Sequence, residues 1–179
     1  LQAVELLGAV FALFLGGYAW RNRSESGALP LVVITAGVAS WLVGAVGVGF
    51  ASFRDHAPPA AVVLFFGVTT TVAGWGAFAL VFSGRRERVG WRRWALLSVE
   101  PLGVVLVLLT NRYHQWFYQF DPVTGEYAGL GIAYWLHAGY SYLVVLGGDM
   151  TGGESGGARF EFRNVGVVSA SAVSETADD

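Results

Sequence analysis

Long apolar stretches separated by short polar ones dominate the first 148 residues of the chain. A helix that crosses a hydrocarbon core of about 30 Å needs about 20 apolar residues. Five stretches approach or reach that length, and they cover residues 4–20, 29–53, 60–82, 94–110 and 130–148. We therefore expect an all-α integral membrane protein, in which residues 1–148 form a bundle of about five transmembrane helices.

The remaining residues, 149–179, have a different character. They are rich in glycine, serine and alanine and end in two aspartates. Such a composition buries too little apolar surface to offset the entropy of folding, so we expect a flexible, disordered cytoplasmic tail. A weak hairpin over residues 159–168 is the alternative, since apolar and polar residues alternate there. The abrupt change also raises the hypothesis of a frameshift or a truncated gene.

Arginines between the apolar stretches predict the orientation. All eleven basic residues are arginine. Two of them, Arg54 and Arg112, follow the second and fourth stretches, which end on the same side of the membrane. The other nine follow the first, third and fifth stretches and so lie on the opposite side. Positive residues favour the cytoplasmic side of a membrane. Arg21 and Arg23 follow the first stretch instead of preceding it, unlike the basic region of a signal peptide. We expect a multi-pass protein of the plasma membrane with its N-terminus outside and its C-terminus in the cytoplasm.

Composition supports a lipid environment and excludes several kinds of chemistry. Apolar residues make up 54 % of the chain, charged residues 13 %, and the mean hydropathy is +0.52. Soluble domains carry about a quarter charged residues. The net charge of −2 gives no reason to expect a nucleic-acid partner. The chain has no cysteine and no lysine, which excludes disulfides, thiol catalysis and a retinal Schiff base.

Small residues cluster inside the second apolar stretch, for example from Gly44 to Gly49. Small side chains allow transmembrane helices to approach closely. We expect them to pack helices within one bundle, and a homodimer through the same residues is the alternative.

Two ionisable residues lie at membrane depth. Glu100 precedes Pro101, which removes a backbone donor and predicts a helix kink. His137 shares a helical face with Tyr134 and Ser141. Such residues usually face protein or water. They act either as hydrogen-bonded structural groups or in switching and proton coupling. Without a carboxylate cluster or a His-x-x-x-His spacing, we expect neither a metal nor another cofactor.

The fourth and fifth stretches resemble a known family. A Glu-Pro pair is followed by apolar residues and by Thr110-Asn111-x-x-His114, and the next stretch carries a Trp-x-His-x-x-Tyr-x-Tyr pattern from Trp135 to Tyr142. This arrangement resembles the N-terminal seven-helix sensor region of microbial, especially haloarchaeal, histidine kinases. The resemblance covers about residues 1–148 and stops after about five helices.

The resemblance implies a sensory input module of a two-component system, with no enzyme activity of its own and a separate cytoplasmic kinase as partner. It implies helix movement near the kink at Glu100 and Pro101. The residues expected to respond to a ligand or signal are Asn111, His114, Trp116, His137 and Tyr140. The alternatives are a small membrane transporter or redox subunit, or a truncated receptor with no function of its own.

Overall fold

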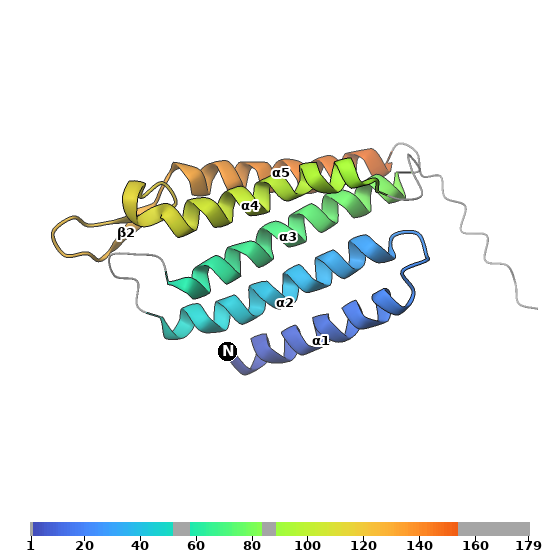
Figure 1. The fold of residues 1–179 in the computed structure, drawn as a ribbon, viewed down its shortest axis with the longest axis horizontal. Helices are drawn as coiled ribbons and strands as arrows, with labels where there is room; N and C mark the ends of the chain where they lie inside the picture. The colour runs from blue at the N-terminus through green and yellow to red at the C-terminus, as the bar shows by residue number, and fades with distance from the viewer. Residues whose placement is uncertain (1, 52–57, 84–88, 154–179) are drawn as a thin grey trace, which may run out of the picture.

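Five helices and one small hairpin make up the part of the chain that the computed structural model describes, residues 2–51, 58–83 and 89–153. Successive helices run in opposite directions (Figure 1). The hairpin lies at one end of the bundle, here called the hairpin end, and α5 finishes at the opposite end. The elements are α1 (Gln2–Arg21), α2 (Ala28–Phe50), α3 (Pro59–Phe82), α4 (Trp91–His114), β1 (Tyr118–Phe120), β2 (Tyr127–Leu130) and α5 (Ile132–Gly153).

The helices have the length and the apolar surface of a membrane bundle, which confirms the expected fold class. Helices α1 to α4 are each long and apolar enough to cross a bilayer. Helix α5 has a similar length of 22 residues, but tyrosines and a histidine interrupt its apolar sequence. Large apolar side chains such as Phe11, Phe14 and Leu102 remain exposed. In a membrane these faces contact lipid, and the helical backbone satisfies its own hydrogen bonds.

Several boundaries differ from those that the apolar pattern predicted. Helix α4 begins at Trp91 and ends at His114, beyond both ends of the expected stretch 94–110, so His114 belongs to its last turn. Helix α2 ends at Phe50, and α5 continues past Gly148. The expected tail hairpin and most arginines behind the orientation lie outside the described residues. The orientation therefore stays a prediction.

The hairpin between α4 and α5 was not predicted. Its strands pair antiparallel, with Tyr118 opposite Leu130. At the turn, one carboxylate oxygen of Asp121 accepts hydrogen bonds from the backbone N–H groups of Val123 and Thr124, both at 2.8 Å. Gly125 follows with φ of 69°, a left-handed conformation that favours glycine. These two N–H bonds hold the pKa of the Asp121 carboxyl below its usual range.

Helices α2 and α3 pack backbone against backbone. A Cβ added to Gly67 would lie 2.2 Å from the backbone nitrogen of Trp41, and one added to Gly44 would lie 2.3 Å from that of Leu64. Neither distance is compatible with a side chain. Small residues therefore allow α2 and α3 to pack closely within this bundle, as expected.

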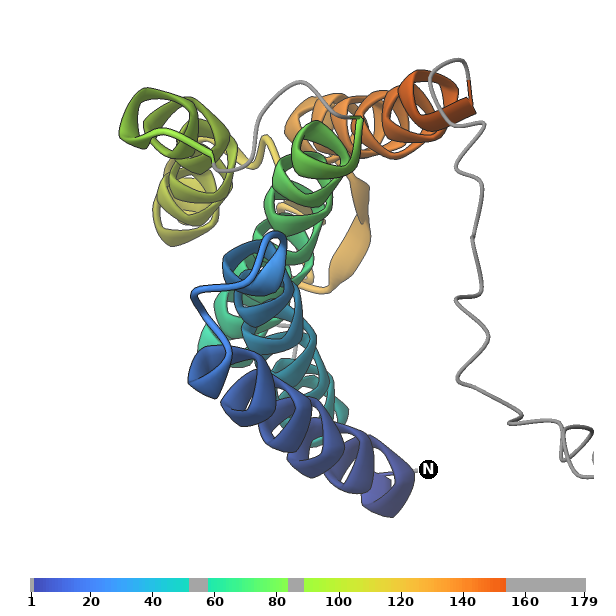
Figure 2. The same cartoon turned by 90° about the vertical axis from the view of Figure 1, so that its right-hand side faces the viewer.

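Helix α3 separates α4 from α5 over much of their length. Seen along the bundle, α4 and α5 lie on either side of the end of α3 (Figure 2), and each packs on α3 more than on the other. A buried cluster closes the hairpin end, where the hairpin packs between these helices. Its fully or nearly buried members are Ala61, Val104, Leu108, Phe117, Tyr118 and Phe120.

Candidate functional site

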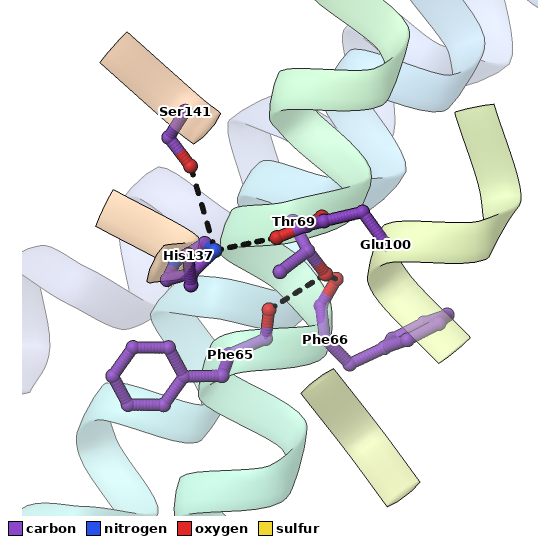
Figure 3. A network of polar contacts seen from close by, with 6 residues as sticks. All are labelled: Phe65, Phe66, Thr69, Glu100, His137 and Ser141. Atoms are coloured by element: carbon purple, nitrogen blue, oxygen red, sulfur yellow. Dashed lines mark hydrogen bonds and ion pairs between the residues drawn. The ribbon is translucent and has the colours of Figure 1, made fainter. Parts of the chain in front are cut away.

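An ion pair joins α4 to α5 near the middle of the bundle. The Nδ1 atom of His137 lies 2.5 Å from Oε1 of Glu100 (Figure 3). The side chains are only 5 % and 15 % exposed, respectively. It is the single ion pair among the described residues. A ring nitrogen and a carboxyl oxygen at this distance form a short hydrogen bond.

Aromatic rings form the wall behind His137. The ring of Phe65, from α3, meets the His137 ring edge to face with centroids 5.9 Å apart, and Phe117 lies 6.5 Å away. Ser141, one turn further along α5, places its hydroxyl 3.5 Å from the same Nδ1 atom. That distance is at the limit for a hydrogen bond, so Glu100 is the main partner of His137.

The second carboxyl oxygen of Glu100, Oε2, is buried without a hydrogen-bond partner among the described residues. A buried acceptor that lacks a donor costs about 1–3 kcal/mol. This atom therefore reduces the stability of the folded protein.

A cavity of about 260 Å³ lies beside the pair, between α4 and α5. Its polar groups come from Glu100, His137 and Tyr140, and the remaining lining is apolar. Phe117 contributes from the hairpin end. The other lining residues are Gly103, Val104, Val107, Ala133 and Leu136.

Asn111 does not line this cavity but fastens the hairpin to α4. It is fully buried, and its Oδ1 accepts hydrogen bonds from the backbone N–H groups of Phe117 at 2.8 Å and Tyr118 at 3.2 Å. Its Nδ2 donates to the Tyr118 carbonyl at 2.8 Å. The side-chain amide of Asn111 thus forms the kind of hydrogen bonds with the chain after α4 that a neighbouring strand would form.

His114 and Gln115 also fasten the chain that leaves α4. We call Asn111, His114 and Gln115 together the Asn111 anchor. The backbone N–H of Trp116 donates to Nδ1 of His114 at 3.0 Å, so the other ring nitrogen carries the hydrogen and donates to the Thr110 hydroxyl, also at 3.0 Å. Gln115 ends the helix in a left-handed conformation, with φ of 52°. Its side-chain oxygen accepts from the backbone N–H of Phe120.

The residues expected to sense a signal thus fall into two groups. His137 and Tyr140 share the α4–α5 cavity with Glu100. His114 and the exposed Trp116 line a separate hollow of about 420 Å³ beside the hairpin, and Asn111 lines neither. Helix α4 is assigned as one helix through the buried Pro101, so the kink stays a prediction, as does each sensing role.

Sequence reasoning placed Glu100 and His137 at membrane depth but treated them separately, and so missed their pairing. The pairing could have been predicted from the sequence, because ionisable residues inside a membrane usually pair with one another. It also missed Phe117, whose burial depends on a hairpin that was not expected. Among the described residues, no group of three potential ligands from histidine, aspartate or glutamate is placed to hold a metal ion.

Residues 4–151 match the family model described as the N-terminal 7TM region of histidine kinase. The match extends from α1 to the last residues of α5 and includes both the cavity and the Asn111 anchor. The family description names seven transmembrane segments, whereas the described residues contain five helices. No curated protein and no solved structure matches the chain.

Proposed function

We propose, from the premise that this chain belongs to the family of N-terminal 7TM regions of histidine kinases, that it is a sensory input module whose switch is the Glu100–His137 pair. In this proposal a signal that makes or breaks the pair changes how α5 lies relative to α3 and α4. The change is passed to a histidine kinase that lies outside residues 1–179.

The observation that carries the proposal is the position of the pair between two helices that otherwise touch little. Each of α4 and α5 packs mainly on α3, and the 2.5 Å contact spans the space between them. A polar contact inside a membrane is worth about 1–2 kcal/mol at most in model peptides. A contribution of that size is small enough for a ligand or a proton to reverse, as a switch requires.

The two ends of the bundle are held differently, which gives the movement a direction. At the hairpin end, the buried cluster and the Asn111 anchor fix α4, the hairpin and the start of α5 to one another. Towards the opposite end the pair is the main side-chain link between α4 and α5 among the described residues. Breaking it should therefore move the far end of α5 more than its start. A shift of packed helices by 1–2 Å is a common form of signalling movement.

With the predicted orientation, the far end of α5 faces the cytoplasm. The movement would then arise on the side where a kinase could respond to it. The proposal thus includes a location in the plasma membrane with the N-terminus outside, which the arginine distribution favours.

Phosphate transfer in native membranes tests the proposal. Membranes from the native cell would be incubated with radiolabelled ATP, and labelled histidine kinases would be compared between cells with and without this chain. We expect His137→Gln to change the labelling of one kinase in the same direction as loss of the chain, at unchanged membrane abundance.

Tyr142→Phe is the matched control, because Tyr142 is exposed on the same helix and does not line the cavity. It should leave labelling at the level of the unaltered chain. If loss of the chain changes no kinase, the sensory function is wrong. If loss changes a kinase but His137→Gln does not, the assignment of the switch is wrong.

A further inference from the structure

The hollow of about 420 Å³ beside the hairpin, here called the hairpin hollow, lies at the hairpin end of the bundle. The hairpin projects past the neighbouring helix ends (Figure 1), and two of the lining residues, Trp116 and Ile132, are 56 % and 62 % exposed. Sites for small molecules commonly have volumes of about 300–1,000 Å³. The hairpin hollow is therefore large enough to hold a small molecule that arrives from water.

Hydrogen bonds hold the sides of the hairpin hollow in place. The side-chain oxygen of Gln115 accepts from the backbone N–H of Phe120 at 3.0 Å, which fixes the end of α4 to β1. The Trp116 carbonyl accepts from the backbone N–H of Ala133 at 2.8 Å, which fixes the same segment to the start of α5. A ligand would therefore meet a site that is already formed, and little of its binding free energy would be lost in ordering the protein.

The described residues that line the hairpin hollow carry one negative charge and no positive charge. Asp121 is the acidic residue among them, and none of them is an arginine. His114 is not a cation in this arrangement, because its Nδ1 accepts the backbone N–H of Trp116. Oδ1 of Asp121 accepts two backbone N–H groups, and the Thr124 hydroxyl also contacts the carboxyl. A carboxylate has about four acceptor sites, so Asp121 can still attract a cation.

Aromatic residues complete this lining and favour an organic cation over a metal ion. The rings of His114 and Trp116 contact each other, with centroids 4.7 Å apart, and Phe120 also lines the hollow. Ammonium groups bind to the faces of aromatic rings, and tryptophan binds them best. A metal ion such as Ca²⁺ instead needs about six to eight oxygen ligands. Among the described residues no cluster of acidic or histidine ligands is placed to supply them.

We propose that the hairpin hollow binds a small organic ammonium ion, whose charge lies between the carboxylate of Asp121 and the ring of Trp116. This proposal rests on the proposed function only for its consequence. Ala133 lies one helical turn before His137 on α5, so a ligand held beside the start of α5 would act on the Glu100–His137 pair. Binding itself is measurable without any kinase.

Histidine signals provide a local readout of binding. The chain contains three histidines, so selective ¹⁵N-histidine labelling of the full chain in lipid nanodiscs gives few ring signals. The His114 signal is identified by its loss in His114→Gln. The probes are choline, ethanolamine and 3,3-dimethyl-1-butanol, an uncharged molecule with the shape of choline. All are compared at physiological ionic strength in nanodiscs of phosphatidylglycerol, a lipid without an ammonium group.

We expect choline or ethanolamine to shift the His114 ring signal saturably. The uncharged probe should bind about tenfold more weakly, because it can form neither the ion pair with Asp121 nor the cation–π contact with Trp116. Equal binding of the charged and uncharged probes would overturn the proposal, since it indicates a site that does not recognise charge. The absence of a shift with both cations would overturn it as well.

Two matched carboxylates test the role of the charge. Asp121→Asn keeps an acceptor for the turn and removes the charge from the hollow, so it should weaken binding of the cations about threefold. Glu126→Gln removes a charge from the same turn at a residue that does not line the hollow, so it should leave binding unchanged. Cation binding that is equal in Asp121→Asn and in the unaltered chain would contradict the assigned site.

Two variants of Trp116 test the aromatic contact. Trp116→Leu removes the ring but keeps the backbone groups that bond to His114 and Ala133, and it should weaken binding of the cations about threefold. Trp116→Phe keeps a ring and should retain most of the binding. Equal binding by Trp116→Leu and the unaltered chain would contradict the cation–π contact. If Trp116→Leu does not fold, the Asp121 and Glu126 variants still test the site.

An ammonium group can belong to a soluble amine or to the headgroup of a lipid. Nanodiscs that contain phosphatidylethanolamine distinguish these sources, because a headgroup that occupies the hollow would weaken the binding of choline. Unchanged binding of choline in these nanodiscs identifies a soluble amine as the ligand.

Failure here is distinct from failure of the proposed function. If no cation moves the His114 signal but His137→Gln still changes kinase labelling, the switch stands and the ligand class is wrong. If the cations bind but no kinase responds to loss of the chain, the binding site stands and the sensory function is wrong.

Discussion

The α2–α3 contact and the α4–α5 contact represent two ways of joining helices in one small bundle. At α2–α3, glycines such as Gly67 and Gly44 bring the backbones so close that no Cβ fits. At α4–α5 the helices leave a cavity of about 260 Å³, and one polar contact from Glu100 to His137 spans it. Close packing has a single arrangement, whereas a polar link can be made or broken. We interpret α1–α3 as the rigid part of the protein and α4–α5 as its responsive part.

The largest expected effect comes from breaking the close contact. Gly67→Leu places a side chain where even a Cβ would lie 2.2 Å from the backbone of Trp41, so α2 and α3 have to separate. We expect destabilisation of about 3 kcal/mol or more, the upper end of overpacking effects. Size-exclusion profiles and thermal unfolding in detergent measure it. Gly139→Leu, the same change at an open position, should behave like the unaltered protein. Equal behaviour of the two variants would contradict the difference between the regions.

The next effect concerns the end at which α4 and α5 are held together. Asn111→Leu removes three hydrogen bonds to the chain that leaves α4, and the buried backbone N–H of Phe117 loses the acceptor that it has in Asn111. Because orphaned buried groups cost about 1–3 kcal/mol, we expect a loss of stability near the upper part of that range. Thermal unfolding provides the measurement. Tyr113→Leu changes an exposed neighbour on the same helix and should have little effect. A fully stable Asn111→Leu protein would show that the anchor is dispensable.

A smaller effect is expected at the polar link itself. Glu100→Leu and His137→Leu should each destabilise the protein by about 1–2 kcal/mol, the scale of polar contacts between membrane helices. The double variant should be more stable than the sum of the single effects predicts, because each single change leaves an unpaired partner. Ser141→Ala removes only the 3.5 Å contact and should be close to neutral. Additive single effects would mean that the two residues are not coupled.

The smallest effect is a pH dependence of the hairpin turn. Its backbone hydrogen bonds lower the pKa of Asp121, so the stability they contribute is present above the usual carboxyl pKa of about 3.9 and is lost as the pH falls through the lowered value. A ¹³C NMR titration of the carboxyl carbons should therefore find the Asp121 midpoint below the usual value. Asp121→Asn keeps an acceptor for the turn but does not titrate. A midpoint at or above the usual value would contradict the turn geometry.

Sequence reasoning predicted the elements that depend on local composition. The apolar stretches predicted five helices, the small residues predicted close helix packing, and the pattern from Glu100 to Tyr142 predicted the family, which the match over residues 4–151 confirms. The hairpin was missed, although the turn from Asp121 to Gly125 carries residues typical of one.

The candidate site was harder to predict because it depends on distant residues. Glu100 and His137 are 37 positions apart, and their meeting depends on how far α4 and α5 run past each other along α3. The volume of a cavity likewise depends on helix separation, which no local pattern encodes. Asn111 and His114 were predicted to respond to a signal because of the family resemblance, and that role stays a prediction. The structure gives both side chains hydrogen bonds to the chain that leaves α4.

The most direct test of the account compares helix movement in the two regions. Since the chain has no cysteine, spin labels can be introduced in pairs without removing native residues. One pair, at the exposed Leu96 and Leu146, reports on α4–α5, and the other, at Leu31 and Phe66, reports on α2–α3. Double electron–electron resonance in nanodiscs would measure both distances with and without Glu100→Leu. We predict that Glu100→Leu shifts or broadens the α4–α5 distance and leaves the α2–α3 distance unchanged. An unchanged α4–α5 distance, or equal changes in both, would contradict the claim that the Glu100–His137 pair controls the movable half of the protein.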